Sequence, residues 1–265
     1  SYDAQGHDFD IASHYFLTWG GNAGKRITTI ADGRGLSYNQ TTNQYEDVIY
    51  HEQNEENHQK SGRIWWGDKM QNNTIKSFGY SIPGISVGDK ISIQTTTTAR
   101  SIQGYPSSMQ LFLNDELLKN IPYSSVSGSY DDRYASDPIK TIVDKTVNSD
   151  QINLTFNYNK SWNEAAAWID YFVITVPRTI QFYGEQKIIR TQRSMLDGNT
   201  RFEISNYNPS TMIWNITDFK NPANQEIDIQ NNSGFFTAEN ITTNNPPLYI
   251  LFDLNSTLSP RFIQK

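Results

Sequence analysis

Alternating apolar and polar side chains in the middle of the chain predict β-strands. The alternation is clear over residues 90–98 and 152–158. Because successive side chains of a strand point to opposite faces of a sheet, both segments are expected to be half-buried strands. Residues 109–113 and 117–121 flank a short polar stretch that begins at Asn114. Two apolar segments around a polar loop are typical of a β-hairpin.

One segment is apolar on both faces. Residues 168–176 combine Trp, Ile, Phe and Val with few polar residues, which predicts a central strand of a two-layer sandwich. Pro177 is expected to end this strand. Residues 163–167 are rich in Ala but too short for an independent helix, so we interpret them as the entry to the same strand. No long segment has helical periodicity, and helix is expected to hold under about a tenth of the residues.

The two ends of the chain follow different patterns. Residues 13–19 and 26–30 lie on either side of a glycine-rich turn and predict a hairpin. Residues 37–60 are rich in Asn, Gln and Glu, as expected of a long surface connection. Short apolar segments follow residue 178 and predict a second, smaller sandwich. Its expected strands are residues 179–183, 201–205, 212–216, 226–229, 234–238 and 248–252.

The predicted fold class is therefore all-β, with a jelly-roll-like β-sandwich as the main domain and a smaller β-sandwich-like domain after it. The main domain is expected over residues 61–178 and the smaller one over 179–265. N-terminal strands over 1–36, also compatible with a preceding domain, and a connecting arm over 37–60 complete the expected organisation. The two β units are expected to meet near residues 177–184.

Composition narrows the classes of partner. The 265 residues are enough for one large or two ordinary domains. A formal charge of −6 without a basic run argues against nucleic acid. No apolar run approaches the length of a membrane span, and the N-terminus lacks the pattern of a signal peptide, so neither is expected in this chain. The chain has no Cys, which excludes disulfides, thiolate metal sites and a cysteine nucleophile within it.

The sequence patterns that point to metal ligands are weakly specific. His51 and His58 lie among acidic residues, but their spacing matches no zinc motif, and a solvated polar loop is the preferred interpretation. A structural calcium ion could be held by carboxylates in loops, and no other cofactor is expected. The calcium candidates are Asp8, Asp10, Asp131 and Asp132. A carboxylate pair of the glycosidase kind, which would make the chain an enzyme by itself, remains open among the many acidic residues.

Clustered aromatic residues suggest a contact surface. Of the adjacent Trp65 and Trp66, one is expected to face the core, while the other covers an end of the sandwich or makes a contact. Stacking on sugar rings and anchoring a protein interface are both open to such residues. The surrounding turn-rich segments add Tyr105, Tyr123, Tyr130 and Tyr134. A stand-alone carbohydrate-binding sandwich is therefore the alternative function.

Three segments, in order, resemble a known family. Residues 45–52, followed by Ser61, Gly62, Arg63, Trp65, Trp66, Gly67 and Asp68, resemble a stretch upstream of the peptidase domain in the PorU family, the type IX secretion sortases of Bacteroidetes. Residues 167–172, with Trp168, Asp170 and Tyr171, are similar to a strand of that family. Residues 214–218 look like its Trp-Asp-Val-Thr-Asp segment, with Asn215 in place of the first Asp. Residues 15–18 and 24–27 extend the resemblance over most of the chain.

The resemblance implies a gingipain-type cysteine endopeptidase at the cell surface. That family removes the C-terminal sorting domain of secreted cargo and joins the cargo to an anionic lipopolysaccharide. Its Cys/His dyad lies downstream of the region that this chain resembles, so no catalytic residue is carried over. The implied role is a non-catalytic N-terminal scaffold and interaction region. A related surface peptidase with the same upstream domains fits the motifs as well.

The resemblance also implies partners and a location. The partners would be the downstream peptidase domain of the same polypeptide and an outer-membrane secretion-system protein. The location would be the extracellular side of the outer membrane of a Bacteroidetes-type bacterium. The residues expected to have structural or interaction roles are Arg63, Trp65, Trp66, Trp168, Tyr171 and Trp214. The Arg63 guanidinium is expected to bind a carboxylate or backbone carbonyls.

Overall fold

The computed structural model divides the chain into two compact units. Unit 1 comprises Ser1–Glu46 and Thr179–Lys265, and unit 2 comprises Asp47–Arg178. The residues that the structure describes are 20–21, 24–60, 64–196, 198–239, 245–257 and 259. Within these ranges the regular elements are strands and three short 3₁₀ turns, without an α-helix. The all-β prediction is confirmed.

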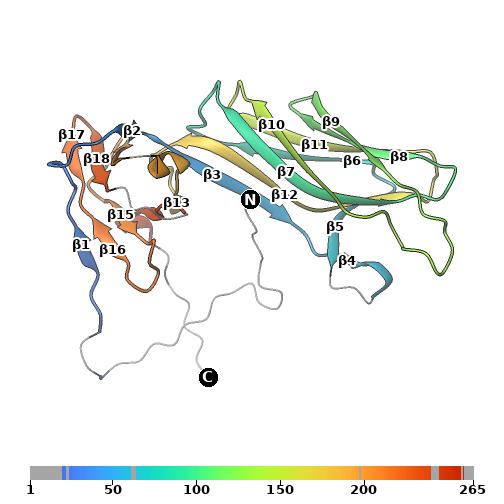
Figure 1. Ribbon diagram of the computed structural model, residues 1–265, viewed down its shortest axis with the longest axis horizontal. Helices are drawn as coiled ribbons and strands as arrows, with labels where there is room; N and C mark the ends of the chain where they lie inside the picture. The colour runs from blue at the N-terminus through green and yellow to red at the C-terminus, as the bar shows by residue number, and fades with distance from the viewer. Residues whose placement is uncertain are drawn as a thin grey trace. The chain divides into compact units, whose positions relative to one another are not determined.

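Unit 2 is a jelly-roll sandwich of two antiparallel sheets (Figure 1). One sheet has the strand order β10-β7-β12-β5-β4, with β3 also paired to β12, and the other has the order β6-β11-β8-β9. Apart from the β8–β9 hairpin within one sheet, the eight strands from β5 to β12 thus alternate between the sheets, as in a double Greek key. Their bounds, with those of two further strands, are β3 Gln44–Glu52, β4 Glu56–Asn57, β5 Trp65–Met70, β6 Ile75–Ser81, β7 Lys90–Arg100, β8 Ser107–Leu113, β9 Glu116–Tyr123, β10 Ile139–Thr146, β11 Gln151–Lys160 and β12 Ala166–Thr179.

Alternation along the strands builds the core of unit 2. Every second side chain of β11 is buried, from Ile152 to Tyr158, as the sequence pattern predicts. The same holds for β8, its neighbour in the sheet. Strand β12 lies inside its sheet, between β7 and β5. It is buried on both faces because Phe172 belongs to the sandwich core, whereas Trp168 is covered by a separate cluster that includes Trp66. The prediction of a central strand is confirmed.

The predicted hairpin around Asn114 is also present. Strands β8 and β9 pair directly on either side of Asn114 and Asp115, whose φ angles are +46° and +66°. Positive φ at both central residues is the requirement of the tight two-residue turn that matches strand twist, and Asn and Asp tolerate it best among residues with a side chain. The local sequence at Asn114 and Asp115 was therefore sufficient to predict this hairpin.

Two expectations about the end of β12 are wrong. The strand continues through Pro177 to Thr179, and residues 180–183 form no strand. Proline removes only a donor, so it is tolerated in a strand where its nitrogen has no ladder partner. The Pro177 carbonyl still accepts a hydrogen bond from the Ser86 N–H over 2.9 Å.

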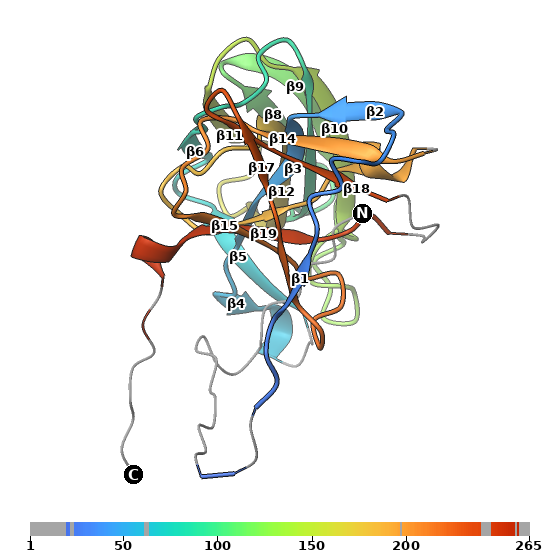
Figure 2. The same ribbon diagram turned by 90° about the vertical axis from the view of Figure 1, so that its left-hand side faces the viewer.

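Unit 1 contains two sheets of shorter strands. One has the order β1-β16-β15-β19-β13, and the other has the order β17-β18-β14-β2. Figure 2 shows β15 and β19 side by side. Aromatic and β-branched side chains fill the core, with the Phe202 and Phe236 rings stacked 4.7 Å apart. The bounds are β1 Thr28–Ile30, β2 Gln40–Thr42, β13 Lys187–Ile189, β14 Thr200–Ile204, β15 Thr211–Asn215, β16 Ala223–Gln225, β17 Asp228–Gln230, β18 Ser233–Ala238 and β19 Tyr249–Asp253.

The structure corrects the expected role of the N-terminal segments. Residues 37–60 are not a connecting arm, because they contain β2, β3, β4 and the 3₁₀ turn η1 (His58–Lys60). Strands β1 and β2 pair in parallel with β16 and β14, so unit 1 is built from both ends of the sequence. The polar composition concealed strands whose formation depends on distant partners. Residues 13–19 of the expected hairpin lie outside the described residues.

No helix in the described part of the chain is long and apolar enough to cross a membrane.

Candidate functional site

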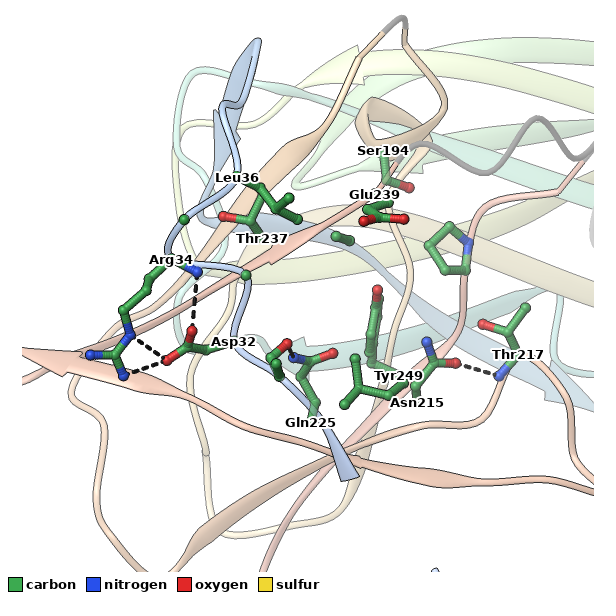
Figure 3. A pocket seen from close by; sticks show the side chains of 16 residues that line it. Asp32, Arg34, Leu36, Ser194, Asn215, Thr217, Gln225, Thr237, Glu239 and Tyr249 are labelled. Carbon is green, nitrogen blue, oxygen red and sulfur yellow. Dashed lines mark hydrogen bonds and ion pairs between the residues drawn. The ribbon is translucent and has the colours of Figure 1, made fainter. Parts of the chain in front are cut away.

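A pocket of about 730 Å³ lies in unit 1 (Figure 3). This volume falls within the range of sites that hold small molecules. Its walls are largely apolar, with polar side chains at a few points. The lining residues are Ile30, Ala31, Asp32, Gly33, Arg34, Gly35, Leu36, Ser194, Asn215, Thr217, Gln225, Thr237, Ala238, Glu239, Pro247 and Tyr249.

Tyr249 is the central polar group of the pocket. The residue is only 2% exposed, and its ring packs against Phe202 and Phe236 at centroid distances of 5.4 and 5.0 Å. Its hydroxyl points into the pocket (Figure 3) and has no hydrogen-bond partner among the described residues. Burial raises the pKa of Tyr249 well above its usual value, so the hydroxyl stays neutral at physiological pH and can both donate and accept.

Two amide side chains are held in place beside Tyr249. The Asn215 Oδ1 accepts a hydrogen bond from the Thr217 N–H over 3.0 Å, which leaves the Asn215 amide N–H groups for another acceptor. The Gln225 Nε2 donates to the carbonyls of Ala31 and Glu226 over 3.0 and 3.2 Å, which leaves the Gln225 carbonyl oxygen for a donor. Both side chains are thus oriented by the fold itself.

An ion pair forms part of the rim. Asp32 accepts hydrogen bonds from the backbone N–H and the Nε of Arg34, each over 3.0 Å, and from its Nη2 over 2.6 Å. These hydrogen bonds lower the pKa of Asp32, and the Arg34 charge offsets that of the carboxylate. The exposed Glu239 carboxylate has no ion-pair partner in the part of the chain that the structure describes. The pocket interior therefore carries neutral polar groups, with charge confined to its rim.

Gly33 shapes the wall that follows β1. Its φ is +66°, and a Cβ at this position would lie 2.7 Å from the Thr237 carbonyl oxygen. Both the dihedral angle and the close approach require glycine. The wall formed by residues 30–36 is therefore set by a single glycine that the sequence analysis did not single out.

Several aromatic residues predicted as site residues form a buried cluster in unit 2. Trp66 and Trp168 are 5% and 0% exposed, and His58 packs against both rings at 5.5 and 4.4 Å. Tyr134 completes the cluster. The Trp168 Nε1 donates to Glu56 over 3.0 Å. These contacts make the cluster a packing feature of the fold.

The remaining aromatic residues predicted as site residues do not lie together in one surface. Trp65 is 49% exposed, as expected of the neighbour of an inward-facing residue in a strand. Because Trp66 is buried, the two Trp residues do not form a joint platform. The Tyr171 hydroxyl accepts a hydrogen bond from Gln94 over 2.9 Å in unit 2, whereas Trp214 packs edge-on against Phe252 in unit 1. Tyr105 and Tyr130 are exposed, while Tyr123 is buried. Arg63 lies outside the described residues.

The acidic and histidine candidates do not assemble into a metal site. Asp132 accepts hydrogen bonds from the Ser127 and Arg133 N–H groups, which lower its pKa. Asp131 is exposed beside it, and Asp8 and Asp10 fall in the part of the sequence that is not described. Across the described ranges, no three His, Asp or Glu side chains are grouped so that they could hold a metal ion.

The interpretation of His51 and His58 as parts of a solvated loop is wrong. His51 stacks on Phe172 at 4.8 Å, and its Nε2 lies 2.6 Å from Asp68. His58 belongs to the aromatic cluster described above. Both histidines are drawn into unit 2 because β3 and η1 pack on its strands, a pairing that local polarity does not reveal.

The fold and the pocket define an all-β protein of two units, one a jelly-roll sandwich and the other a smaller two-sheet unit with a small-molecule-sized cavity. The chain is similar to dimeric latent PorU from Porphyromonas gingivalis, with a TM-score of 0.76 and 18% sequence identity. The likeness covers 89% of this chain and 22% of the PorU chain, so the chain spans about a fifth of that protein's length. The chain has a PorU-like fold. The resemblance to the PorU family predicted from the sequence is therefore confirmed for the fold.

Carbohydrate-binding modules are much less similar. The CBM36-1 domain of a multidomain xylanase from the hindgut metagenome of Trinervitermes trinervoides has a TM-score of 0.30 and 10% identity, over 49% of this chain and 95% of that domain. A CBM36 module in complex with calcium and xylotriose has a TM-score of 0.28 and 8% identity, over 49% and 96% of the two chains. These values are too low to support a shared function. No family model and no curated protein matches the sequence.

Proposed function

We propose that this chain is a non-catalytic β region of a cell-surface cysteine peptidase of the type IX secretion sortase kind. The observation that carries the proposal is the likeness to one stretch of PorU over 89% of the chain, at a TM-score of 0.76. A likeness of this extent includes both units, whereas a generic sandwich would match only one of them. The ordered motifs described for the sequence support the same relationship.

The chemistry of the chain is consistent with a supporting role. Peptide cleavage by this class needs a thiolate nucleophile, and the 265 residues contain no Cys. In the proposed arrangement the nucleophile belongs to a downstream peptidase domain of the same polypeptide. Units 1 and 2 hold that domain at the extracellular side of the outer membrane and offer surface to a secretion-system protein. The activity of the whole polypeptide is removal of C-terminal sorting domains from secreted cargo.

The reading frame of the source gene is the first test. We expect the codons after Lys265 to encode a further domain that contains both a Cys and a His. A frame that stops directly after Lys265 would contradict the proposal. In that case the function would have to be one that these 265 residues perform by themselves.

An activity assay is the second test. The whole polypeptide is expected to cleave a reporter protein that carries a C-terminal sorting domain, and a Cys→Ala variant of its downstream domain is expected to be inactive. The purified 265-residue chain is expected to be inactive on the same reporter. Cleavage by that chain, blocked by substitution of one of its own residues, would overturn the proposal.

A further inference from the structure

The pocket in unit 1 combines three properties that together define a ligand. It is of small-molecule size, its walls are apolar, and its interior holds polar atoms that the described residues leave without partners. Such atoms can form hydrogen bonds only to water or to a ligand inside the cavity. The Tyr249 hydroxyl is one of them, since its oxygen faces the cavity although the residue as a whole is only 2% exposed.

The walls specify an apolar ligand body. Ile30, Ala31 and Leu36 line the cavity from one segment of the chain, and Ala238 and Pro247 line it from two others. An apolar body against these side chains removes water from both surfaces, which is the main source of affinity in pockets of this size. The polar groups then fix the orientation of the ligand.

The polar groups specify an uncharged head. The Tyr249 hydroxyl can donate and accept, the Asn215 amide N–H groups can donate, and the Gln225 carbonyl oxygen can accept. Figure 3 shows Gln225 and Asn215 on the two flanks of Tyr249, and Glu239 beyond the end of its ring that carries the hydroxyl. A hydroxyl or a carboxamide matches such a mixed set. An anionic head would lose its hydration shell without meeting a free cation, because Arg34 is already bound to Asp32 over 2.6 Å. The unpaired Glu239 carboxylate is exposed to solvent, so a cationic head bound at Tyr249 would gain little from it in exchange for its own hydration.

We propose that the unit 1 pocket binds an uncharged small molecule with an apolar body and a hydroxyl or carboxamide head, and that the head hydrogen-bonds to Tyr249. This site is separate from the peptidase function proposed above and does not depend on it. It would give unit 1 a ligand of its own.

A matched series of probes tests the chemistry. The probes are 4-propylphenol, propylbenzene and 4-propylbenzoate, which share a body and differ in the head. Binding to the whole 265-residue chain is followed by calorimetry and by protein NMR at neutral pH. We expect saturable binding of 4-propylphenol, and about tenfold weaker binding of each of the other two, since one hydrogen bond or one uncompensated charge is at stake. Equal binding of the benzoate and the phenol, or no saturable binding of any probe up to about 5 mM, would overturn the proposal.

A pair of Tyr→Phe variants tests the site. Tyr249→Phe removes the hydroxyl and keeps the ring, so we expect the preference for 4-propylphenol over propylbenzene to disappear while the melting temperature does not fall. Tyr207→Phe is the control in the same unit, because the Tyr207 hydroxyl donates to the Thr211 carbonyl over 2.9 Å and does not line the pocket. The control is expected to melt lower and to bind the phenol normally. Unchanged preference in Tyr249→Phe would place the ligand elsewhere and refute the assignment.

Discussion

The Arg178 guanidinium donates a hydrogen bond from Nη1 to the Asp47 Oδ2 over 2.6 Å, and the two side chains are 5% and 10% exposed. Asp47 is the first residue of unit 2 and Arg178 is the last. The Arg178 Nε also donates to the Pro83 carbonyl over 2.7 Å. A buried ion pair therefore joins the two ends of the segment that forms the jelly roll.

Arg178→Met should strongly destabilise unit 2. The substitution removes the guanidinium from a buried carboxylate, and loss of one partner of such a pair costs about 3–5 kcal/mol. Urea denaturation followed by tryptophan fluorescence measures the change. Arg133→Met is the control, because the Arg133–Asp137 pair is exposed, and its loss should cost under about 1 kcal/mol. Equal costs for the two variants would show that the Asp47–Arg178 pair contributes no more than a surface pair.

Trp66 and Trp65 should respond very differently to substitution by Ala. Trp66 is 5% exposed and Trp65 is 49% exposed. Removing a buried Trp side chain costs about 3–5 kcal/mol, so Trp66→Ala should lower the melting temperature by many degrees. Trp65→Ala should cost about 1 kcal/mol or less. If neither variant changed the melting temperature but both lost binding to a sugar or a secretion-system protein, a contact role for this pair would replace the packing role.

His58→Phe should reduce the loss of stability of unit 2 in mild acid. Burial lowers the pKa of His58 below its usual value, and the nearby cations Lys69 and Arg100 lower it further, while Glu56 opposes the shift. Because the unfolded state then binds the proton more readily, wild-type stability falls as the pH drops through about 6.5. Phe keeps the contacts with the Trp rings and cannot be protonated. Melting temperatures at pH 7.5 and 5.5 measure the effect, and equal slopes for wild type and variant would contradict it.

Asp170→Asn should stabilise unit 2 at neutral pH. Burial raises the pKa of Asp170 to about 6, and the Glu52 carboxylate adds to the shift. The folded state therefore binds more protons than the unfolded state between about pH 4 and pH 6, so ionisation of Asp170 costs stability as the pH rises through this window. Asn avoids this cost, which predicts a gain on the order of 1 kcal/mol at pH 7 that vanishes below about pH 4.

A surface aspartate is the control for Asp170. Asp144 lies on β10 in the same sheet and is exposed, so Asp144→Asn should leave the denaturation midpoint nearly unchanged at both pH values. An Asp170→Asn variant that is less stable than wild type at pH 7 would mean that the carboxylate makes a favourable contact that outweighs its desolvation.

The part of the fold that was predictable depends on short-range patterns. The turn at Asn114 and Asp115 needs only two residues that tolerate positive φ, and the alternation from Ile152 to Tyr158 marks a strand by itself. The inward direction of one of the two adjacent Trp residues also follows from strand geometry. In each case the evidence lies within a few residues of the chain.

The sequence alone therefore determined that this is an all-β protein, with a sandwich in its middle and a resemblance to one family. Only the tertiary structure decided the strand partners and the pocket. Thr28 pairs with Ala223, and the cavity wall at Gly33 meets Thr237, both across about 200 residues of sequence. Pairing and cavity formation depend on which distant backbone reaches a given edge, and no local propensity encodes that choice.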